Sequence, residues 1–302
     1  MRRPLPRVSG LGAEILTGLY RHRLVSTSQV HVIHAPELTR RRIRMVLCDL
    51  ERTGYVCRVG IAGSMETAWY VAGAGAEAVE GAGVDVRSYR LNASRAGGPL
   101  QAHTMAVNDV GIAFLEAARR RGEDFDVASW RHEAAHPLGE GRKPELVIAD
   151  AVLDYVVHDP DGEVLVCRFV ELDRATMSVR EVATKLANYA RLHAYQPAAR
   201  PGSEAPRGWR QHYHRRFPKV MVVMSGRPAP TLARRRDSLL ELVRRDARVM
   251  ALRDELGISV ATLDDLRRDG PFAGVFRRLG DPATPVDVLG RPAPGHVERA
   301  AG

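Results

Sequence analysis

Three carboxylates in the middle of the chain have the residue types and the spacing that a metal site requires. Glu145 follows Pro144 at the start of an apolar segment, and Glu171 and Asp173 lie two residues apart at the end of another. Positions i and i+2 of a strand share a face, so Glu171 and Asp173 should converge, with Glu145 joining from a neighbouring strand. Oxygen ligands suit a hard divalent cation, which predicts a Mg²⁺ or Mn²⁺ site at these three acids.

Phosphodiester hydrolysis is the chemistry that such a site would serve. A bound metal polarises the phosphoryl oxygen and makes water a better nucleophile. A lysine often orients that water or balances the developing charge. Lys185 lies twelve residues after Asp173, in a helical segment, and is the candidate for this role. Glu145, Glu171, Asp173 and Lys185 are therefore the predicted catalytic set.

The elements that must position these residues are predicted to form an α/β (α+β) domain over residues 101–279. Hydrophobic periodicity predicts helices over 101–121, 178–195 and 232–256, and strands over 127–132, 145–157, 164–172 and 219–224. This order is typical of a mixed sheet flanked by helices. Residues 81–100 are predicted to be a linker, and residues 280–302, rich in Pro and Gly, a disordered tail.

Residues 1–80 are predicted to form a winged helix-turn-helix domain, because three helical segments precede a hairpin. Ser26-Thr27-Ser28 is the expected capping segment of the second helix, and Thr53-Gly54 ends the third. The third helix would enter the major groove of DNA. Its predicted DNA-contacting residues are Thr39, Arg40, Arg41, Arg42 and Arg44. Two alternatives are a solvated arginine face and a surface for dimerisation or protein contacts.

The charge balance also favours a polyanionic partner. The net charge is +9 and the sequence pI is about 9.9, which predicts binding to double-stranded DNA. The arginine excess is also typical of a GC-rich bacterial genome, so charge alone leaves both interpretations open. The three cysteines form no CxxC pair, and no signal peptide or membrane span is expected, so the predicted location is the cytoplasm.

The second domain resembles the PD-(D/E)XK nucleases. Glu145 in Lys143-Pro144-Glu145 matches the first acid of that family, and Glu171 matches the second. The family's lysine position holds Asp173, a departure that bears directly on catalysis. Lys185, four residues before Tyr189 in the next helix, resembles a relocated lysine. The start of a later helix, Arg234-Arg235-Arg236, is expected to hold phosphates.

Residues 10–250 together resemble the actinobacterial replication-relaxation family. The segments that carry the resemblance are Arg40-Arg41-Arg42-Ile43, the helix from Gln101 to Asn108, Lys143-Pro144-Glu145-Leu146, and Phe169 to Thr176 with Lys185 and Tyr189. The resemblance implies a plasmid or mobile-element protein that acts on DNA in replication or relaxation. Further candidate partners are other replication or transfer proteins and, in a homodimer, a second copy of the chain. The supporting site residues are His103, Asn108, Arg174, Thr176 and Tyr189.

Two other functions remain open at this point. In the first, the nuclease-like domain is inactive and the protein is a DNA-binding regulator or replication-accessory protein, which the missing acid-x-Lys pattern favours. In the second, His212 and His214 hold the metal of a relaxase that uses a covalent tyrosine intermediate.

Overall fold

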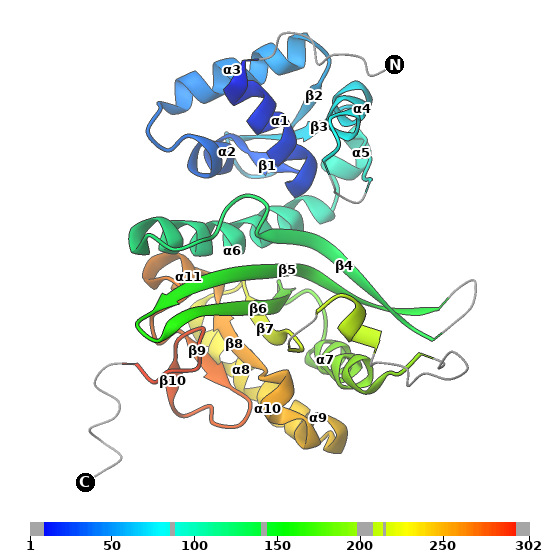
Figure 1. Ribbon diagram of the computed structural model, residues 1–302, viewed down its shortest axis with the longest axis vertical. Helices are drawn as coiled ribbons and strands as arrows, with labels where there is room; N and C mark the ends of the chain where they lie inside the picture. The colour runs from blue at the N-terminus through cyan, green and yellow to red at the C-terminus, as the bar shows by residue number, and fades with distance from the viewer. Residues whose placement is uncertain (1–8, 85–87, 140–143, 198–207, 214–215, 294–302) are drawn as a thin grey trace. The chain divides into compact units, whose positions relative to one another are not determined.

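The computed structural model describes residues 9–84, 88–139, 144–197, 208–213 and 216–293 (Figure 1). The chain divides into two compact units, Met1–Leu115 and Glu116–Gly302. The described residues form a three-stranded antiparallel sheet in the first unit and a seven-stranded mixed sheet in the second. The fold class is therefore α+β, as the sequence predicted.

The first unit begins with the element order expected of a winged helix-turn-helix. Its elements are α1 (Gly10–His22), β1 (Val25–Ser26), α2 (Thr27–His34), α3 (Arg40–Arg52), β2 (Val56–Gly60) and β3 (Thr67–Val71). The strand order is β1-β3-β2, and β2 and β3 are the predicted hairpin. The buried faces of the three helices meet around side chains such as Leu16, Val30 and Leu47.

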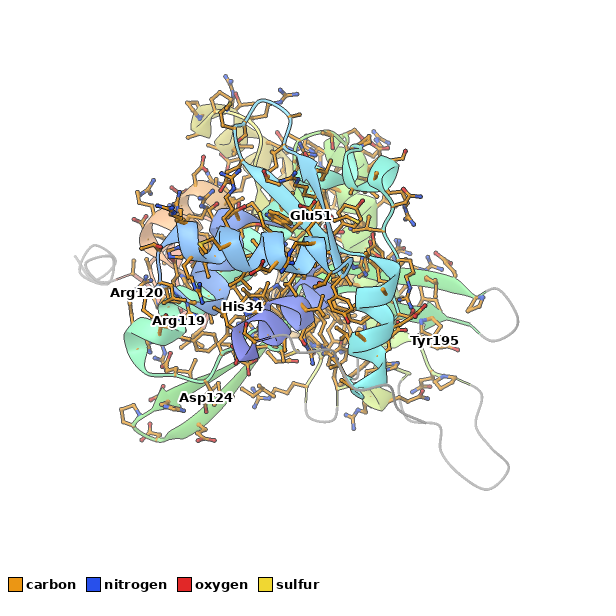
Figure 2. All side chains as sticks on the ribbon, turned by 90° about the horizontal axis from the view of Figure 1, so that it is seen from above. His34, Glu51, Arg119, Arg120, Asp124 and Tyr195 are labelled. Atoms are coloured by element: carbon orange, nitrogen blue, oxygen red, sulfur yellow. The ribbon has the colours of Figure 1, made fainter. Side chains whose placement is uncertain are left out.

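Local sequence signals explain where these helices begin and end. Ser26 and Gln29 form a reciprocal capping box at the start of α2. Thr39 caps α3 by accepting a hydrogen bond from the backbone N–H of Arg42 at 3.3 Å. Gly54 follows α3 with a φ of 77°, a conformation that favours glycine. Gly18 in α1 lies against the ring of His34, where any Cβ would overlap. His34 is labelled in Figure 2.

The remainder of the first unit contains more helix than expected. It comprises α4 (Gly73–Gly81), α5 (Ala93–Ala96) and the start of α6 (Leu100–Arg121), whose second part belongs to the second unit. The predicted linker of residues 81–100 thus includes α5, and Ala96 there is fully buried. Gln101 fixes the start of α6 by donating to the carbonyl of Gly60 at 3.0 Å.

The second unit is built on a sheet in the order β10-β9-β8-β7-β6-β5-β4 (Figure 1). Its strands are β4 (Trp130–Leu138), β5 (Glu145–Asp159), β6 (Gly162–Asp173), β7 (Lys219–Met224), β8 (Ser259–Thr262), β9 (Phe276–Arg278) and β10 (Pro285–Val286). β6, β7 and β8 are parallel to one another, and the other neighbouring pairs are antiparallel.

Helices α7 and α8 pack on one face of this sheet. The helical elements of the unit after α6 are α7 (Val179–Ala194), the 3₁₀ turn η1 (Gly208–Gln211), α8 (Ala229–Arg244), α9 (Ala247–Ala251), α10 (Arg253–Leu256) and α11 (Leu263–Asp269). Ser178 and Glu181 form the capping box that starts α7. The stripe of α7 that includes Leu186 and Tyr189 joins Phe169 of β6 and Leu239 of α8 in one core.

Two predictions for the C-terminal part were wrong. The helix expected over 232–256 is three helices, because Asp246 accepts backbone hydrogen bonds from Arg248 and Val249 and so starts α9 anew. Residues 280–293 of the expected disordered tail are ordered. They supply β10, and Val286 and Val288 are buried in the unit. Residues 294–302 lie outside the described chain.

Candidate functional site

Glu171 is a buried carboxylate in the middle of the core between the sheet and α7. Only 3% of the residue is exposed. The hydroxyl of Tyr189 donates a hydrogen bond to its Oε1, and the ammonium of Lys185 contacts its Oε2. Both partners lie on α7, one turn apart, so the helix that covers β6 delivers them together. The structure thus brings Glu171, Lys185 and Tyr189 together.

The second carboxylate at this point is Asp150, in the neighbouring strand β5. Its Oδ1 lies 3.0 Å from the Lys185 ammonium, and its Oδ2 accepts a hydrogen bond from the backbone N–H of Leu172 at 2.8 Å. The antiparallel pairing of β5 and β6 brings Ala151 opposite Val170, which sets Asp150 beside Glu171. Lys185 thus bridges two carboxylates from adjacent strands.

The charges at this cluster are strongly coupled. Burial, and after it the charge of Asp150, raise the pKa of Glu171 to about 8, while Lys185 and Tyr189 act in the opposite direction. Burial lowers the pKa of Lys185, but the charges of Glu171 and Asp150 outweigh it and the net shift is upward. Burial raises the pKa of Tyr189 well above its usual value. One ammonium therefore serves two carboxylates that repel each other.

Asp173 shares the face of Glu171, as the spacing predicted, but has a different partner. Arg235 of α8 donates to it from Nε at 2.6 Å and from Nη2 at 3.0 Å. The same guanidinium donates to the carbonyl of Met177, and the backbone N–H of Ala175 donates to Asp173. Arg235, which was expected to hold phosphates, is therefore engaged in a nearly buried ion pair within the fold.

Glu145 lies at the exposed start of β5. Arg191 of α7 forms a two-pronged ion pair with it, both N–O distances being 2.6 Å. This guanidinium lowers the pKa of Glu145. Lys143, which precedes it in the motif quoted above, lies outside the described residues.

The three predicted metal ligands are thus held by three different cations. Within the described chain, no group of three or more His, Cys, Asp or Glu side chains has an arrangement that could hold a metal ion. The cluster that does form contains Asp150, which sequence reasoning missed in favour of Glu145. The signal was available, since Asp150 is a carboxylate with apolar residues on either side in the strand, and burying a charge is costly unless it is paired.

Two carboxylates remain sufficient for one class of metal. Mg²⁺ is usually bound by one or two protein carboxylates, with water and substrate phosphate as its other ligands. Asp150 and Glu171 match that donor set, and their mutual repulsion is the feature that a divalent cation would relieve. The pair fits Mg²⁺ or Mn²⁺ in the presence of a phosphate ligand, and three-carboxylate coordination does not fit.

The arginine face of α3 is a separate feature, in the first unit. Arg40, Arg41, Arg42 and Arg44 are all exposed. None of them forms an ion pair with an acid in the described chain, whereas Arg58 on β2 pairs with Glu51 of α3 at 3.3 Å. Glu51 is labelled in Figure 2. These arginines are available to an external anion, and Thr39 beside them serves as the cap of the helix.

Comparison with known proteins identifies the family. A family model described as Replication-relaxation matches residues 16–203, more than half of the chain. The chain belongs to the replication-relaxation family. The matched stretch includes Asp150, Glu171 and Lys185. No curated protein and no solved structure matches this replication-relaxation chain. None of its described helices combines the length and the apolar character that crossing a bilayer requires.

The predicted supporting residues of this replication-relaxation protein have diverse surroundings. Asn108 is buried in the first unit, where it donates to the carbonyls of His22 and Leu24. With these hydrogen bonds Asn108 has a structural role in the core of the first unit, which was the alternative to a place in the site. His103 is half-buried on α6 in the same unit. Arg174 and Thr176 follow β6, and the Arg174 carbonyl approaches Gly226 so closely that a Cβ there would lie 2.9 Å away.

The histidine motif of the relaxase alternative is only partly described. His212 and Tyr213 follow η1, and His214 lies outside the described residues. Tyr213 is 3.0 Å from Nε2 of His136, and burial raises its pKa. Burial, and after it the charge of His212, lower the pKa of His136 to about 4. A tyrosine with a raised pKa is a poor nucleophile, so Tyr213 does not favour the covalent mechanism.

Proposed function

We propose that this replication-relaxation protein binds double-stranded DNA of a plasmid or other mobile element and nicks it by metal-dependent hydrolysis. The observation that carries the proposal is the cluster of Asp150, Glu171 and Lys185. Two carboxylates on adjacent strands, with a lysine between them, are the groups that a phosphoryl-transfer site requires. The family match supports a role in replication or relaxation.

Each residue of the cluster has a part in this reaction. Asp150 and Glu171 would hold Mg²⁺ or Mn²⁺, which when bound polarises the phosphoryl oxygen and lowers the pKa of water. Lys185 would then be released to orient the attacking water or to stabilise the charge on the phosphoryl group. The Tyr189 hydroxyl and the Leu172 backbone N–H would keep the two carboxylates in position.

The α3 arginines would supply the affinity for DNA. They are exposed, they lie at the start of one helix, and the chain carries a net charge of +9. Contacts of this kind bind the phosphate backbone without regard to sequence, and they position the protein on the duplex.

A plasmid assay tests the nicking reaction. Supercoiled plasmid is incubated with the native chain, with Asp150→Asn and with Glu171→Gln, each with Mg²⁺, with Mn²⁺ or with EDTA. We expect relaxed product only with metal. Each substitution should reduce the nicking rate by more than about 100-fold. Mutation of residues that only hydrogen-bond to metal ligands already lowers metal affinity or activity by about 10–100-fold.

Glu145→Gln is the matched control, since it removes one carboxylate charge from the same strand. Its side chain pairs with Arg191 outside the cluster, so the nicking rate should stay within about twofold of the native rate. If Glu145→Gln instead lowers the nicking rate as much as Asp150→Asn does, Glu145 belongs to the active site. Contaminating nuclease is excluded if the product disappears in both cluster variants, purified identically.

The second candidate function is a DNA-binding regulator without catalytic activity. It is favoured by the ion pairs within the fold. Lys185 already pairs with both carboxylates of the cluster, and Arg235 pairs with Asp173, so these acids have cationic partners without a metal. It predicts that the native chain and all three variants shift DNA equally on a gel and that none of them nicks it with any metal. That result would replace the nicking proposal.

A further inference from the structure

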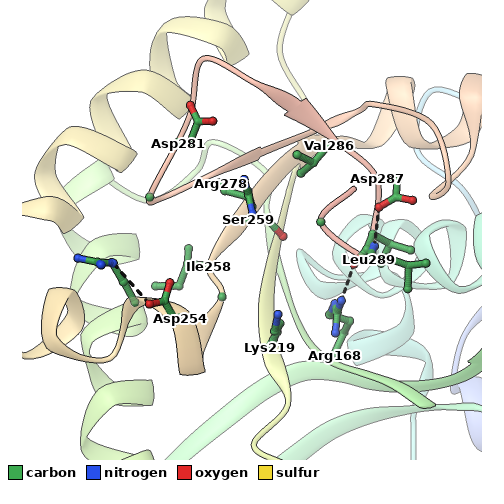
Figure 3. A pocket seen from close by; sticks show the side chains of 15 residues that line it. Arg168, Lys219, Asp254, Ile258, Ser259, Arg278, Asp281, Val286, Asp287 and Leu289 are labelled. Atoms are coloured by element: carbon green, nitrogen blue, oxygen red, sulfur yellow. Dashed lines mark hydrogen bonds and ion pairs between the residues drawn. The ribbon is translucent and has the colours of Figure 1, made fainter. Parts of the chain in front are cut away.

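A cavity of about 340 Å³ lies at the start of β7 and β8, under the segment of residues 286–290 (Figure 3). Four cationic side chains line it, Arg168, Lys219, Arg253 and Arg278, of which Arg253 pairs with Asp254. Arg168 is three residues before Glu171 in β6, so the two side chains point to opposite faces of the strand. The cavity is therefore separate from the Asp150–Glu171–Lys185 cluster.

The sheet register brings these cations together. Arg168 and Lys219 are direct partners in the parallel pairing of β6 and β7. Arg278 of β9 is the partner of Ser259 in β8, and Ser259 also lines the cavity. Neighbours in register project from the same face of a sheet, so the cationic side chains enter one space.

The side chains of Lys219 and Arg278 form no hydrogen bond and no ion pair in the described chain. Burial lowers the pKa of Lys219, and the charges of Arg168, Arg216 and Arg278 lower it further, against the opposing charge of Asp254. Arg168 is only 8% exposed and donates to the carbonyls of Cys167 and Val288. The cavity thus has one more cation than acids among its lining residues, and Lys219 and Arg278 are the cations without a direct partner in the described chain.

The acids at the same cavity are engaged elsewhere. Asp287 accepts backbone hydrogen bonds from Leu289 at 2.9 Å and from Arg291 at 2.8 Å. Asp281 accepts them from Ala283 and Thr284. Asp254 pairs with Arg253 at 3.7 Å. Each acid also acts through its charge on a cation of the cavity, Asp254 on Lys219, Asp281 on Arg278 and Asp287 on Arg168. Within the described chain, however, none of these three pairs is an ion pair in direct contact.

The backbone also makes room for the lysine. Gly257 ends α10 with a φ of 49°, and a Cβ there would lie 2.6 Å from Cδ of Lys219. The aliphatic part of Lys219 therefore lies against the bare Cα of Gly257. This contact limits the positions open to the ammonium and lowers the entropy that it would lose on binding a ligand.

We propose that this cavity binds a terminal phosphate or diphosphate group, with Lys219 and Arg278 as its contacting cations. A terminal phosphate carries close to two negative charges at neutral pH and offers three acceptor oxygens, which matches several convergent donors. The volume falls within the range of small-molecule sites, roughly 300–1,000 Å³. The group can come from a free nucleotide or from the phosphorylated end of a DNA strand. Binding here is independent of nicking, because the two sites share no residue.

Calorimetric titration of the full chain with pyrophosphate tests the proposal. The chains compared are native, Lys219→Met, Arg278→Gln and the control Arg180→Gln, which removes one positive charge from an exposed position on α7. Lys219 and Arg278 are exposed enough that both variants should fold, as their circular dichroism would verify. We expect each of these two to weaken binding roughly tenfold or more, and the control to leave it unchanged.

Two further ligands distinguish the sources of the phosphate. A nucleoside triphosphate that binds more tightly than pyrophosphate, with the same dependence on Lys219, identifies a free nucleotide. A short oligonucleotide that binds more tightly with a 5′-phosphate than with a 5′-hydroxyl, again only when Lys219 is present, identifies a strand end. No binding of pyrophosphate, or equal binding by all four chains, overturns the proposal.

Discussion

The Nζ atom of Lys185 lies 3.0 Å from Oδ1 of Asp150, a residue 35 positions earlier in the chain. The same ammonium contacts Glu171, so it is the one cation that balances two carboxylates on adjacent strands. Replacing it therefore does more than remove an ion pair. It leaves the buried Glu171 facing Asp150, which is partly buried, and the fold must bind a proton or another cation to tolerate them.

Lys185→Met is expected to lower the free energy of unfolding by about 1–3 kcal/mol, more at pH 9 than at pH 6. The folded-state pKa of Glu171, about 8, lies above its usual value, so the native state holds a proton that the unfolded state has lost. Stability from this group is present at low pH and is lost as pH rises through 8. Urea unfolding at both pH values measures the difference, with Arg180→Gln as the charge-matched control. Equal losses at the two pH values would contradict the coupling.

Tyr189→Phe tests whether the tyrosine positions Glu171. The substitution removes only the hydroxyl that donates to Oε1. We expect the nicking rate to fall by about 10–100-fold with DNA affinity unchanged. That hydrogen bond lowers the pKa of Glu171, so without it the rise of the nicking rate with pH should move to higher pH. A slower reaction with an unshifted pH profile would indicate a merely structural tyrosine.

Arg235→Met should be strongly destabilising, by about 3–5 kcal/mol, because Asp173 would be left buried without its cation. Adding Asp173→Asn should recover at least half of that loss, which urea unfolding of the single and double variants measures. DNA affinity should not change beyond the effect of stability. If Arg235→Met weakens DNA binding while leaving stability intact, the arginine is a phosphate contact after all.

Arg41→Gln should weaken DNA binding and reduce the slope of log K against log salt by about one. The side chain is exposed and has no acidic partner among the described residues. Arg52→Gln is the control on the same helix, since Arg52 pairs with Asp49 at 3.5 Å. Fluorescence anisotropy at several salt concentrations gives the slope for each of the three chains. Identical slopes for native, Arg41→Gln and Arg52→Gln chains would show that α3 does not contact the phosphates.

The elements of the fold could be read from the sequence wherever one periodic pattern dominated. The strand Lys219–Met224 was predicted as it occurs, and the cap of α2, Ser26, lies in the predicted capping segment Ser26-Thr27-Ser28. The breaks that were missed, such as the one at Asp246, depend on a single side chain that competes with the helix for backbone hydrogen bonds. The order of residues 280–293 depends on the burial of Val286 and Val288, which local composition does not report.

The site was predictable in part for a similar reason. Lys185 and Tyr189 were selected through their resemblance to a nuclease helix motif. Their separation of four residues puts both on one face of α7, where they contact Glu171. The choice between Glu145 and Asp150 required the register of β5 against β6, which is a property of the assembled sheet. Asp173 and Arg235, which form an ion pair, are 62 positions apart, so no local sequence pattern predicts their contact.

The closeness of Asp150, Glu171 and Lys185 along the chain has a consequence for how the protein forms. One hairpin and the helix after it contain all three, so the cluster closes a short loop, and the entropy lost in closing it is small. Contacts of such low sequence separation form quickly. Residues 150–185 also leave the ribosome before β7, α8 and the strands beyond them are made. The acids of β5 and β6 can therefore meet their lysine while the remainder of the sheet is still being synthesised.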